Sequence, residues 1–345
     1  MPGLAVAALL LSSAPCSHSF GWQKVWETTL PRQNSTGVAI GGFSAASYDA
    51  RRDRLSLLSD LSDVQLSTWS GVADGPALKP LFSMALATGP SSRSNVVIDG
   101  EAFVIANGQI WLASEGRRSA DRPAQLLQLA AKTGALIKAM ALPPDWQPSP
   151  TGGLESNSGP ESLIQLNAPG QPLQLLMAAE KPLRQDPADQ VRLLRWWWSP
   201  QNNPNVDPPQ ASPQGALQLP LDLPSALPSD KGWGLTDLLA WRDRKEQPVT
   251  LLALLRRYIA PNTWHNRLAL YRLPRPGTVS KPLQSWDLQS IGLTPDNWEG
   301  LSQGPTSADG RPTLLLVSDD NLNPAQANRL ALLKPERPTS CRSDS

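Results

Sequence analysis

Residues 99–115 read DGEAFVIANGQIWLASE, and they show most clearly the pattern from which the fold can be predicted. It contains two short apolar runs, DGEAFVI from Asp99 and IWLASE up to Glu115, with acidic residues at their outer ends. Short apolar and aromatic runs that are bounded by Gly, Asp and Asn are typical of strands. The stretch therefore predicts two strands that carry acidic residues at their ends.

The same arrangement recurs along the chain, as it does in repeat architectures. Turns with an acidic residue or its equivalent, each followed by a short strand, begin at Gly41, Asp99, Gly153, Gly232 and Asp296. Apolar strands that end in a charged residue follow them, with ends at Asp60, Glu115, Glu180, Arg257 and Asp320. A third strand led by a polar residue comes next and begins near Val64, Ala124, Val191, Asn266 and Asn328.

A looser fourth strand completes every unit except the last. These strands are PLFSMAL, ALIKAMALP, ALQLPLDLP and KPLQSWDLQ, and we expect VWETTLP at residues 25–31 to supply the missing one. Four antiparallel strands per unit, repeated radially, predict an all-β propeller whose ring is closed by the N-terminal strand. The chain shows five units, and the long interval between the third and the fourth leaves room for a sixth blade.

Three further segments bear on the fold. The runs LTDLLAWRD and LLALLRRYI also fit helical periodicity, but their length and their flanking residues favour strands. The Pro-, Gln- and Asn-rich stretch at residues 199–214 is predicted to be an irregular surface loop, because strands resume on both sides of it. Trp196, Trp197 and Trp198 would alternate between the faces of a strand, and we expect them to pack between blades rather than to bind a sugar.

The N-terminal sequence indicates export. Leu4 to Leu11 is an apolar run that is too short to span a bilayer but suits the core of a signal peptide, and small residues precede Phe20. We expect a signal peptide at 1–19, a propeller domain at 20–335 and a polar tail at 336–345, in a periplasmic or secreted protein. A lipoprotein anchored at Cys16 is the alternative, which Pro15 disfavours.

Composition excludes several classes of protein. The net charge of +1 gives no electrostatic reason to expect nucleic acid or an anionic membrane as partner, and no later segment is apolar enough to be transmembrane. The two cysteines, Cys16 and Cys341, form neither a disulfide framework nor a zinc site. Ser44 lies outside a Gly-x-Ser-x-Gly motif and His265 lies beside a turn, so no serine-hydrolase triad is expected. We expect a monomer that acts on small molecules.

Acidic motifs recur in a fixed order along the chain. They are Ser59-Asp60, Asp99-Gly100-Glu101, Ser114-Glu115-Gly116, Gly153-Leu154-Glu155, Glu180, Asp296-Asn297-Trp298-Glu299-Gly300 and Ser318-Asp319-Asp320-Asn321. In this order they resemble the phytase-like family called "esterase-like activity of phytase", from about Gly41 to Leu333. The resemblance implies hydrolysis of phosphoesters or other esters. The family usually has Glu-Arg where this chain has Arg256-Arg257, so one acid of the set is missing.

The repeat itself also points to a site. Inner strands of a propeller line a central channel, so residues at equivalent strand ends converge on one rim. The repeat assigns Glu101, Glu155 and Glu299 to one such position, and it assigns Asp60, Glu115, Glu180 and Asp319 to another. Carboxylates gathered at a rim repel one another unless cations neutralise them, and oxygen-rich clusters suit calcium. The alternative is that each acid caps a turn or binds a backbone N–H group.

The leading hypothesis is therefore an exported, metal-dependent hydrolase of phosphoesters that uses Ca²⁺. The expected catalytic residues are Glu299, Glu101 and Glu155, and the expected metal ligands are Asp60, Glu115, Glu180, Asp319 and Asn297. Arg117 and Arg257 are expected to bind the phosphate of the substrate. The alternative is a non-catalytic propeller scaffold that binds calcium or another ligand.

Overall fold

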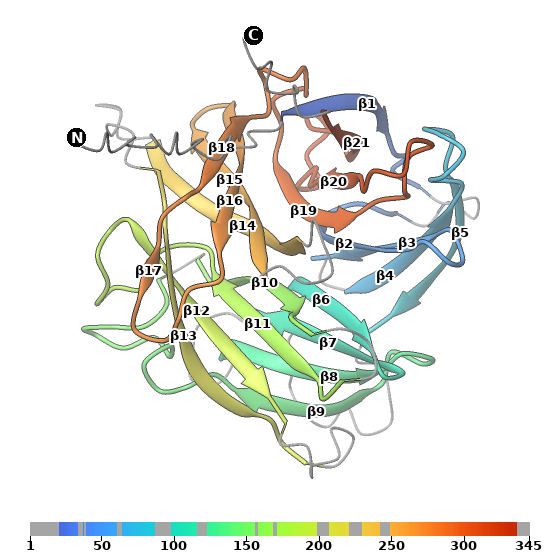
Figure 1. Cartoon of the computed structure of the whole chain (residues 1–345). Helices are drawn as coiled ribbons and strands as arrows, with labels where there is room; N and C mark the ends of the chain where they lie inside the picture. The colour runs from blue at the N-terminus through green and yellow to red at the C-terminus, as the bar shows by residue number, and fades with distance from the viewer. Residues whose placement is uncertain are drawn as a thin grey trace, which may run out of the picture.

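The structure is a computed structural model that describes residues 21–33, 37, 39–60, 64–86, 98–115, 123–155, 158–167, 171–198, 207–220, 230–241 and 249–336. Every regular element within these ranges is a β-strand. The strands form five sheets arranged in a ring (Figure 1). This confirms the all-β propeller, and the described residues contain five blades rather than six. Among these residues we find none that form a membrane-spanning helix.

Each blade follows the predicted order, with its first strand innermost. Blade 1 consists of β2 (Phe43–Asp49), β3 (Arg54–Ser59), β4 (Gln65–Ser70) and β5 (Lys79–Ala85). Blade 2 consists of β6 (Gly100–Ala106), β7 (Gln109–Ser114), β8 (Gln125–Ala130) and β9 (Leu136–Ala141). Blade 3 consists of β10 (Pro160–Gln165), β11 (Gln174–Ala179), β12 (Gln190–Trp197) and β13 (Gln210–Gln218).

Blades 4 and 5 complete the ring. Blade 4 consists of β14 (Asp230–Trp241), β15 (Thr250–Ile259), β16 (Thr263–Arg272) and β18 (Gln284–Asp287). Blade 5 consists of β19 (Trp298–Gln303), β20 (Leu314–Ser318), β21 (Arg329–Pro335) and the N-terminal β1 (Trp22–Thr29). The inner strands contact one another in chain order, and β19 contacts β2. The segments that also fitted helical periodicity lie in β14 and β15, so both are strands.

The N-terminal strand closes the ring as the sequence predicts. β1 pairs antiparallel with β21, from Trp22 opposite Pro335 to Thr29 opposite Arg329. Trp22 is buried, and its ring meets that of Trp241 edge-on at 5.5 Å, which adds an aromatic contact between blades 4 and 5. The first and the last described strands of the chain therefore share one blade, in which β1 is the outermost of four strands.

The outer part of blade 3 differs from the prediction. Residues 210–214, which we expected in an irregular loop, belong to β13, while ALQLPLDLP contributes only its first three residues to that strand. Pro213 is tolerated because the register shifts beside it, between Leu193 and Leu194 of β12. The short strand β17 (Val279–Ser280) lies between β16 and β18 in the sequence but pairs parallel with β13, at the side of blade 3 (Figure 1).

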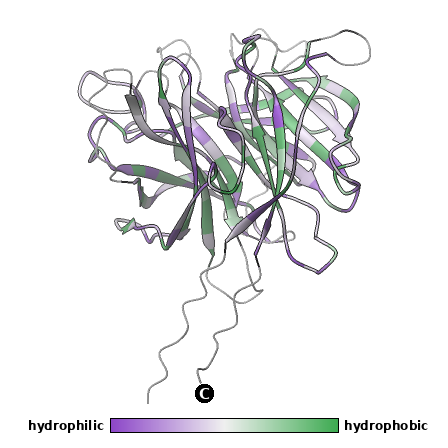
Figure 2. Cartoon of the chain, turned by 90° about the horizontal axis from the view of Figure 1, so that it is seen from above, coloured by the Kyte–Doolittle hydropathy of each residue, from purple (hydrophilic) through white to green (hydrophobic). Residues whose placement is uncertain are grey.

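Apolar side chains fill the spaces between blades. Hydrophobic residues lie mainly on the strands and hydrophilic residues mainly on the loops (Figure 2). Trp196 and Trp198 are buried and Trp197 is half-buried, which is the alternation expected along β12. The ring of Trp198 meets that of Trp111 on blade 2 at 4.7 Å, so this tryptophan packs between blades as predicted.

Candidate functional site

A β-bulge interrupts every inner strand, near the start of four of them and near the middle of β14. The register shifts between Phe43 and Ala45, Gly100 and Ala102, Pro160 and Ser162, Leu235 and Asp237, and Trp298 and Gly300. The residues at the five bulges are accordingly Ser44, Glu101, Glu161, Thr236 and Glu299. A bulge removes one residue from the ladder and re-aims its side chain, so each blade offers one side chain at this level.

The two hydroxyl residues of this set join neighbouring blades. Ser44 Oγ donates a hydrogen bond of 2.6 Å to the carbonyl of Gly100, on the next blade. Thr236 Oγ1 makes the same contact at 3.2 Å with the carbonyl of Trp298. These two bulges are therefore used for structure, and the three glutamates at the other bulges are left to form a site.

A second set of residues lies directly after the second strand of each blade. The backbone N–H groups of Asp60, Glu115, Glu180 and Asp319 donate bonds of 2.8, 2.9, 2.9 and 2.9 Å to the residues that precede the inner strands. Arg256 occupies the same place in blade 4, where it pairs with Gly234 of β14. The structure thus brings the four predicted acids to equivalent positions, with one arginine among them.

The position assigned to Glu155 is occupied by Glu161. Glu155 is exposed and lies before β10, whereas Glu161 is the bulge residue of that strand and is buried. Burial raises the pKa of Glu161, as do the charges of Glu101 and Glu180. The sequence held a signal for it, because Glu161 opens the apolar strand of GPESLIQL just as Glu101 opens that of DGEAFVI.

Together these acids form what we call the acidic ring. Its members are Asp60, Asp99, Glu101, Glu115, Glu161, Glu180, Glu299 and Asp319. Burial, followed by the charges of Glu299 and Asp99, raises the pKa of Asp60 to about 7. Burial also raises the pKa of Glu101, and the charges of Glu115 and Glu299 add to it. The members therefore lie close enough to disfavour ionisation of one another.

Three members of the ring form a compact group, the carboxylate triad of Asp99, Glu101 and Glu115. One carboxylate oxygen from each lies within 4.8 Å of the other two, a spacing that could hold a metal ion. Glycine makes room for this group, because a Cβ atom at Gly159 would lie 2.4 Å from Cγ of Glu115. Oxygen donors at this spacing fit a hard cation such as Ca²⁺.

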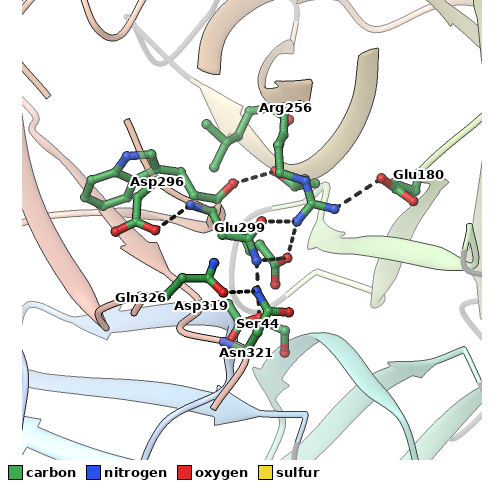
Figure 3. Close-up of polar contacts among 12 residues, drawn as sticks. Ser44, Glu180, Arg256, Asp296, Glu299, Asp319, Asn321 and Gln326 are labelled. Carbon is green, nitrogen blue, oxygen red and sulfur yellow. Dashed lines mark hydrogen bonds and ion pairs between the residues drawn. The ribbon is translucent and has the colours of Figure 1, made fainter. Parts of the chain in front are cut away.

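Arg256 neutralises the opposite side of the ring. Its guanidinium group donates hydrogen bonds to Glu299, to Asn297 Oδ1 at 2.6 Å and to Glu180 Oε1 at 3.2 Å, as Figure 3 shows for the two glutamates. Asn297 in turn donates bonds from Nδ2 to Glu299 Oε1 at 2.8 Å and to Asp319 Oδ2 at 3.2 Å. Asn297 and Glu299 are thus committed to contacts within the protein.

The remaining predicted residues lie at the edge of the site or outside the described residues. Arg257 follows Arg256 in β15, so its side chain points to the other face of the strand, and it pairs with Trp233 and His265. Arg117 lies outside the described residues. His265 is exposed on β16.

Fold and site define a five-bladed propeller with acidic side chains gathered at the starts of its inner strands. The chain belongs to the phytase-like family, "Esterase-like activity of phytase", whose model matches residues 38–322. The match covers blades 1 to 4 and the first strands of blade 5, and it includes every described member of the acidic ring.

Comparison with solved structures finds matches of low similarity. The N-terminal domain of Nup159 covers 93% of this chain and 96% of its own, with 8% identity and a TM-score of 0.36. The β-propeller domain of Cps50 (Swd1) from Myceliophteria thermophila covers 84% and 83%, with 10% identity and a TM-score of 0.36. Similarities at this level carry no information on function. No curated protein matches the chain.

Proposed function

We propose that this protein is a metal-dependent hydrolase of phosphoesters and related esters, and that the acidic ring is its active site. The observation that carries the proposal is the carboxylate triad, whose three oxygens lie within 4.8 Å of one another. Membership of a hydrolase-like propeller family supports the same reaction class. The chain's own sequence and fold therefore favour hydrolysis over a purely structural role.

The triad would hold the cation. Asp99, Glu101 and Glu115 supply only oxygen ligands, which calcium prefers to other donors. A divalent cation there would lower the pKa of a bound water and screen the charge of a phosphoester. Export, which we also propose from the apolar N-terminal run, would place the protein where calcium is abundant.

Glu161 is the residue that we assign to proton transfer. It sits at the bulge of the blade next to Glu101, and the charges of Glu101, Glu180 and Glu115 all act on it. Glu299, by contrast, forms an ion pair with Arg256, which commits it to a contact within the protein. A carboxylate beside the triad can accept the proton of the attacking water, and general-base catalysis of this kind contributes about 10²–10⁴-fold in rate.

A second candidate function is a non-catalytic scaffold that binds calcium or another ligand. The observation that favours it is Arg256, which stands where the family usually has an acid. Its bonds to Glu180 and Glu299 neutralise two members of the ring within the protein. A site with fewer free carboxylates has fewer groups for chemistry, although it keeps the triad.

Calcium titration and ester hydrolysis test the proposal together. We expect calorimetry to show calcium binding that Glu115→Gln weakens at least tenfold, and we expect calcium-dependent hydrolysis of 4-nitrophenyl phosphate or 4-nitrophenyl acetate. Glu161→Gln should slow hydrolysis about 100-fold and leave calcium binding intact. The matched control is Glu336→Gln, because Glu336 is exposed and follows β21 at the end of the blade away from the ring. Calcium binding with no hydrolysis of either ester would favour the scaffold.

A further inference from the structure

Blade 4 extends beyond the level at which the other blades end. Their second strands stop at Ser59, Ser114, Ala179 and Ser318. Leu255 occupies this place in blade 4, but β15 continues to Ile259 and stays paired with β16 from Asn266 to Thr263. The β15–β16 hairpin therefore projects past the acidic ring.

One face of this projecting hairpin is turned toward the ring. Side chains alternate along a strand, so Arg256 and Tyr258 lie on the same face. Arg256 reaches Glu180 and Glu299, which identifies this face as the one beside the acids. Trp264 lies opposite Tyr258 on β16 and belongs to the same face.

The two aromatic residues form a continuous surface, which we call the aromatic wall. The rings of Tyr258 and Trp264 have centroids 4.3 Å apart and planes inclined by 35°. The guanidinium carbon of Arg256 lies 5.7 Å from the centre of the Trp264 ring, within the range of a cation–π contact. Both rings are half-buried, so part of each remains accessible.

The wall is held in place before any ligand arrives. Tyr258 donates a hydrogen bond of 2.6 Å from its hydroxyl to the carbonyl of Pro261 at the tip of the hairpin. Arg256, beneath the wall, is anchored on two glutamates from different blades. A preorganised aromatic surface loses little conformational entropy when a flat group stacks on it.

We infer that the aromatic wall selects substrates, and that it favours esters whose alcohol part is a flat aromatic group. This inference rests on the proposed function and adds the class of substrate. The ester group would lie at the carboxylate triad while the aryl group stacks on Trp264 and Tyr258. Stacking supplies attraction that an alkyl group of similar size cannot obtain, because it depends on an aromatic face.

Binding of two phosphonates that the enzyme cannot hydrolyse tests the inference without relying on catalysis. By calorimetry in the presence of calcium, the wild type should bind phenylphosphonate about 5- to 10-fold more tightly than methylphosphonate. Trp264→Ala should reduce this ratio below about twofold, while Trp264→Phe and Tyr258→Phe should keep it. Phe82→Ala is the control, because Phe82 is 60% exposed on the outer strand β5.

A third substitution at Trp264 controls for the possibility that Trp264→Ala unfolds the hairpin. Trp264→Leu keeps an apolar side chain on β16 but cannot stack, so it should lose the preference with an unchanged melting temperature. Equal affinities in the wild type, no binding of either phosphonate, or a preference that survives both Trp264→Ala and Trp264→Leu would each overturn the inference. A preference for phenylphosphonate in a protein that hydrolyses no ester would support the inference about the aromatic wall and refute the proposed hydrolase activity. The two failures are therefore distinguishable.

Discussion

Arg256 on blade 4 donates a hydrogen bond of 3.2 Å from Nη2 to Oε1 of Glu180, which follows the second strand of blade 3. The same guanidinium group also bonds to Glu299 on blade 5, so one cation links three blades at the level of the acidic ring. Because these charges are largely buried, the arginine offsets repulsion that would otherwise act among the carboxylates. Stability and cation binding should consequently be coupled through this residue.

Replacing Arg256 by methionine should make the protein depend on calcium. Glu180 and Glu299 would lose their cationic partner, and removing one member of a buried ion pair costs about 3 kcal/mol or more. Urea unfolding with a chelator should show this loss, and calcium should restore more stability to Arg256→Met than to the wild type. Arg51→Met is the control, because Arg51 is exposed in the turn after β2. An unchanged free energy of unfolding would show that the ion pairs contribute nothing.

Stability without calcium should fall as the pH rises from 5 to 8. The folded protein holds protons on Asp60, whose pKa is about 7, and on Glu101 and Asp319, whose pKa values burial raises. The unfolded chain releases these protons near pH 4, so the stabilisation is complete below that pH and is lost as the pH rises through the folded values. The hydrogen bond with Arg311 lowers the pKa of Asp309, so this group titrates below pH 5 and does not contribute to the change.

The measurement is the melting temperature in chelator at pH 5 and at pH 8. We expect a decrease of several degrees, since about 1 kcal/mol shifts the melting temperature of a domain of about 150–250 residues by roughly 2–4 °C, and several groups add up here. Asp60→Asn should flatten the curve, and calcium should do the same in the wild type by stabilising the ionised acids. A melting temperature that is constant or rises between these pH values would contradict the electrostatic account.

Gly159→Ala should disturb the carboxylate triad, although Gly159 lies far from the three acids in the sequence. A methyl group at this position would meet Glu115 at 2.4 Å from Cγ, so the carboxylate must move. Overpacking of this kind costs about 1–3 kcal/mol, and we expect at least a tenfold loss of calcium affinity by calorimetry. Gly108→Ala, where the added methyl group meets open space, should cost stability through its positive φ of 74° but should bind calcium normally. Equal calcium affinities in the two variants would show that the carboxylate triad does not form the cation site.

Deleting residues 20–31 should open the ring. β1 supplies the outermost strand of blade 5, and its loss would expose the edge of β21 and remove the buried Trp22 from its contact with Trp241. Exposed strand edges promote association between chains. We expect a melting temperature lower by more than 10 °C and oligomers in size-exclusion chromatography, with Val25→Ala, a substitution at an exposed position of β1, as the control. A monomer of unchanged stability would show that ring closure by β1 is dispensable.

The fold was predictable because the repeat supplied what single segments could not. LLALLRRYI fits helical periodicity, and its length, its flanking residues and its equivalence with IWLASE and TLLLVSDD together identify β15 as a strand. The same equivalence located Asp60, Glu115, Glu180 and Asp319 at matching strand ends. It failed for Glu155, because the Gly-Leu-Glu motif lies ahead of the strand, whereas the residue that matches Glu101 in opening the apolar strand is Glu161.

Other features depend on contacts that the sequence does not encode locally. The pairing of β13 with β17 requires two segments about sixty residues apart to meet, and nothing in the Pro-rich stretch at 199–214 announces a strand. The role of Arg256 was hidden for a similar reason. The sequence shows a missing acid, whereas the structure shows that the replacement binds the acids contributed by two neighbouring blades.

The pairing of β17 with blade 3 bears on how the chain is made, because β17 lies between two strands of blade 4 in the sequence. The outer edge of β13 pairs with Val279 and Ser280, which are synthesised only after β14, β15 and β16. A ribosome therefore releases the third blade with its edge uncovered, and the edge is sealed once most of the fourth blade has emerged. The two blades should mature as one co-translational unit, and a pause in synthesis between residues 218 and 279 would lengthen the period in which this edge can capture another nascent chain.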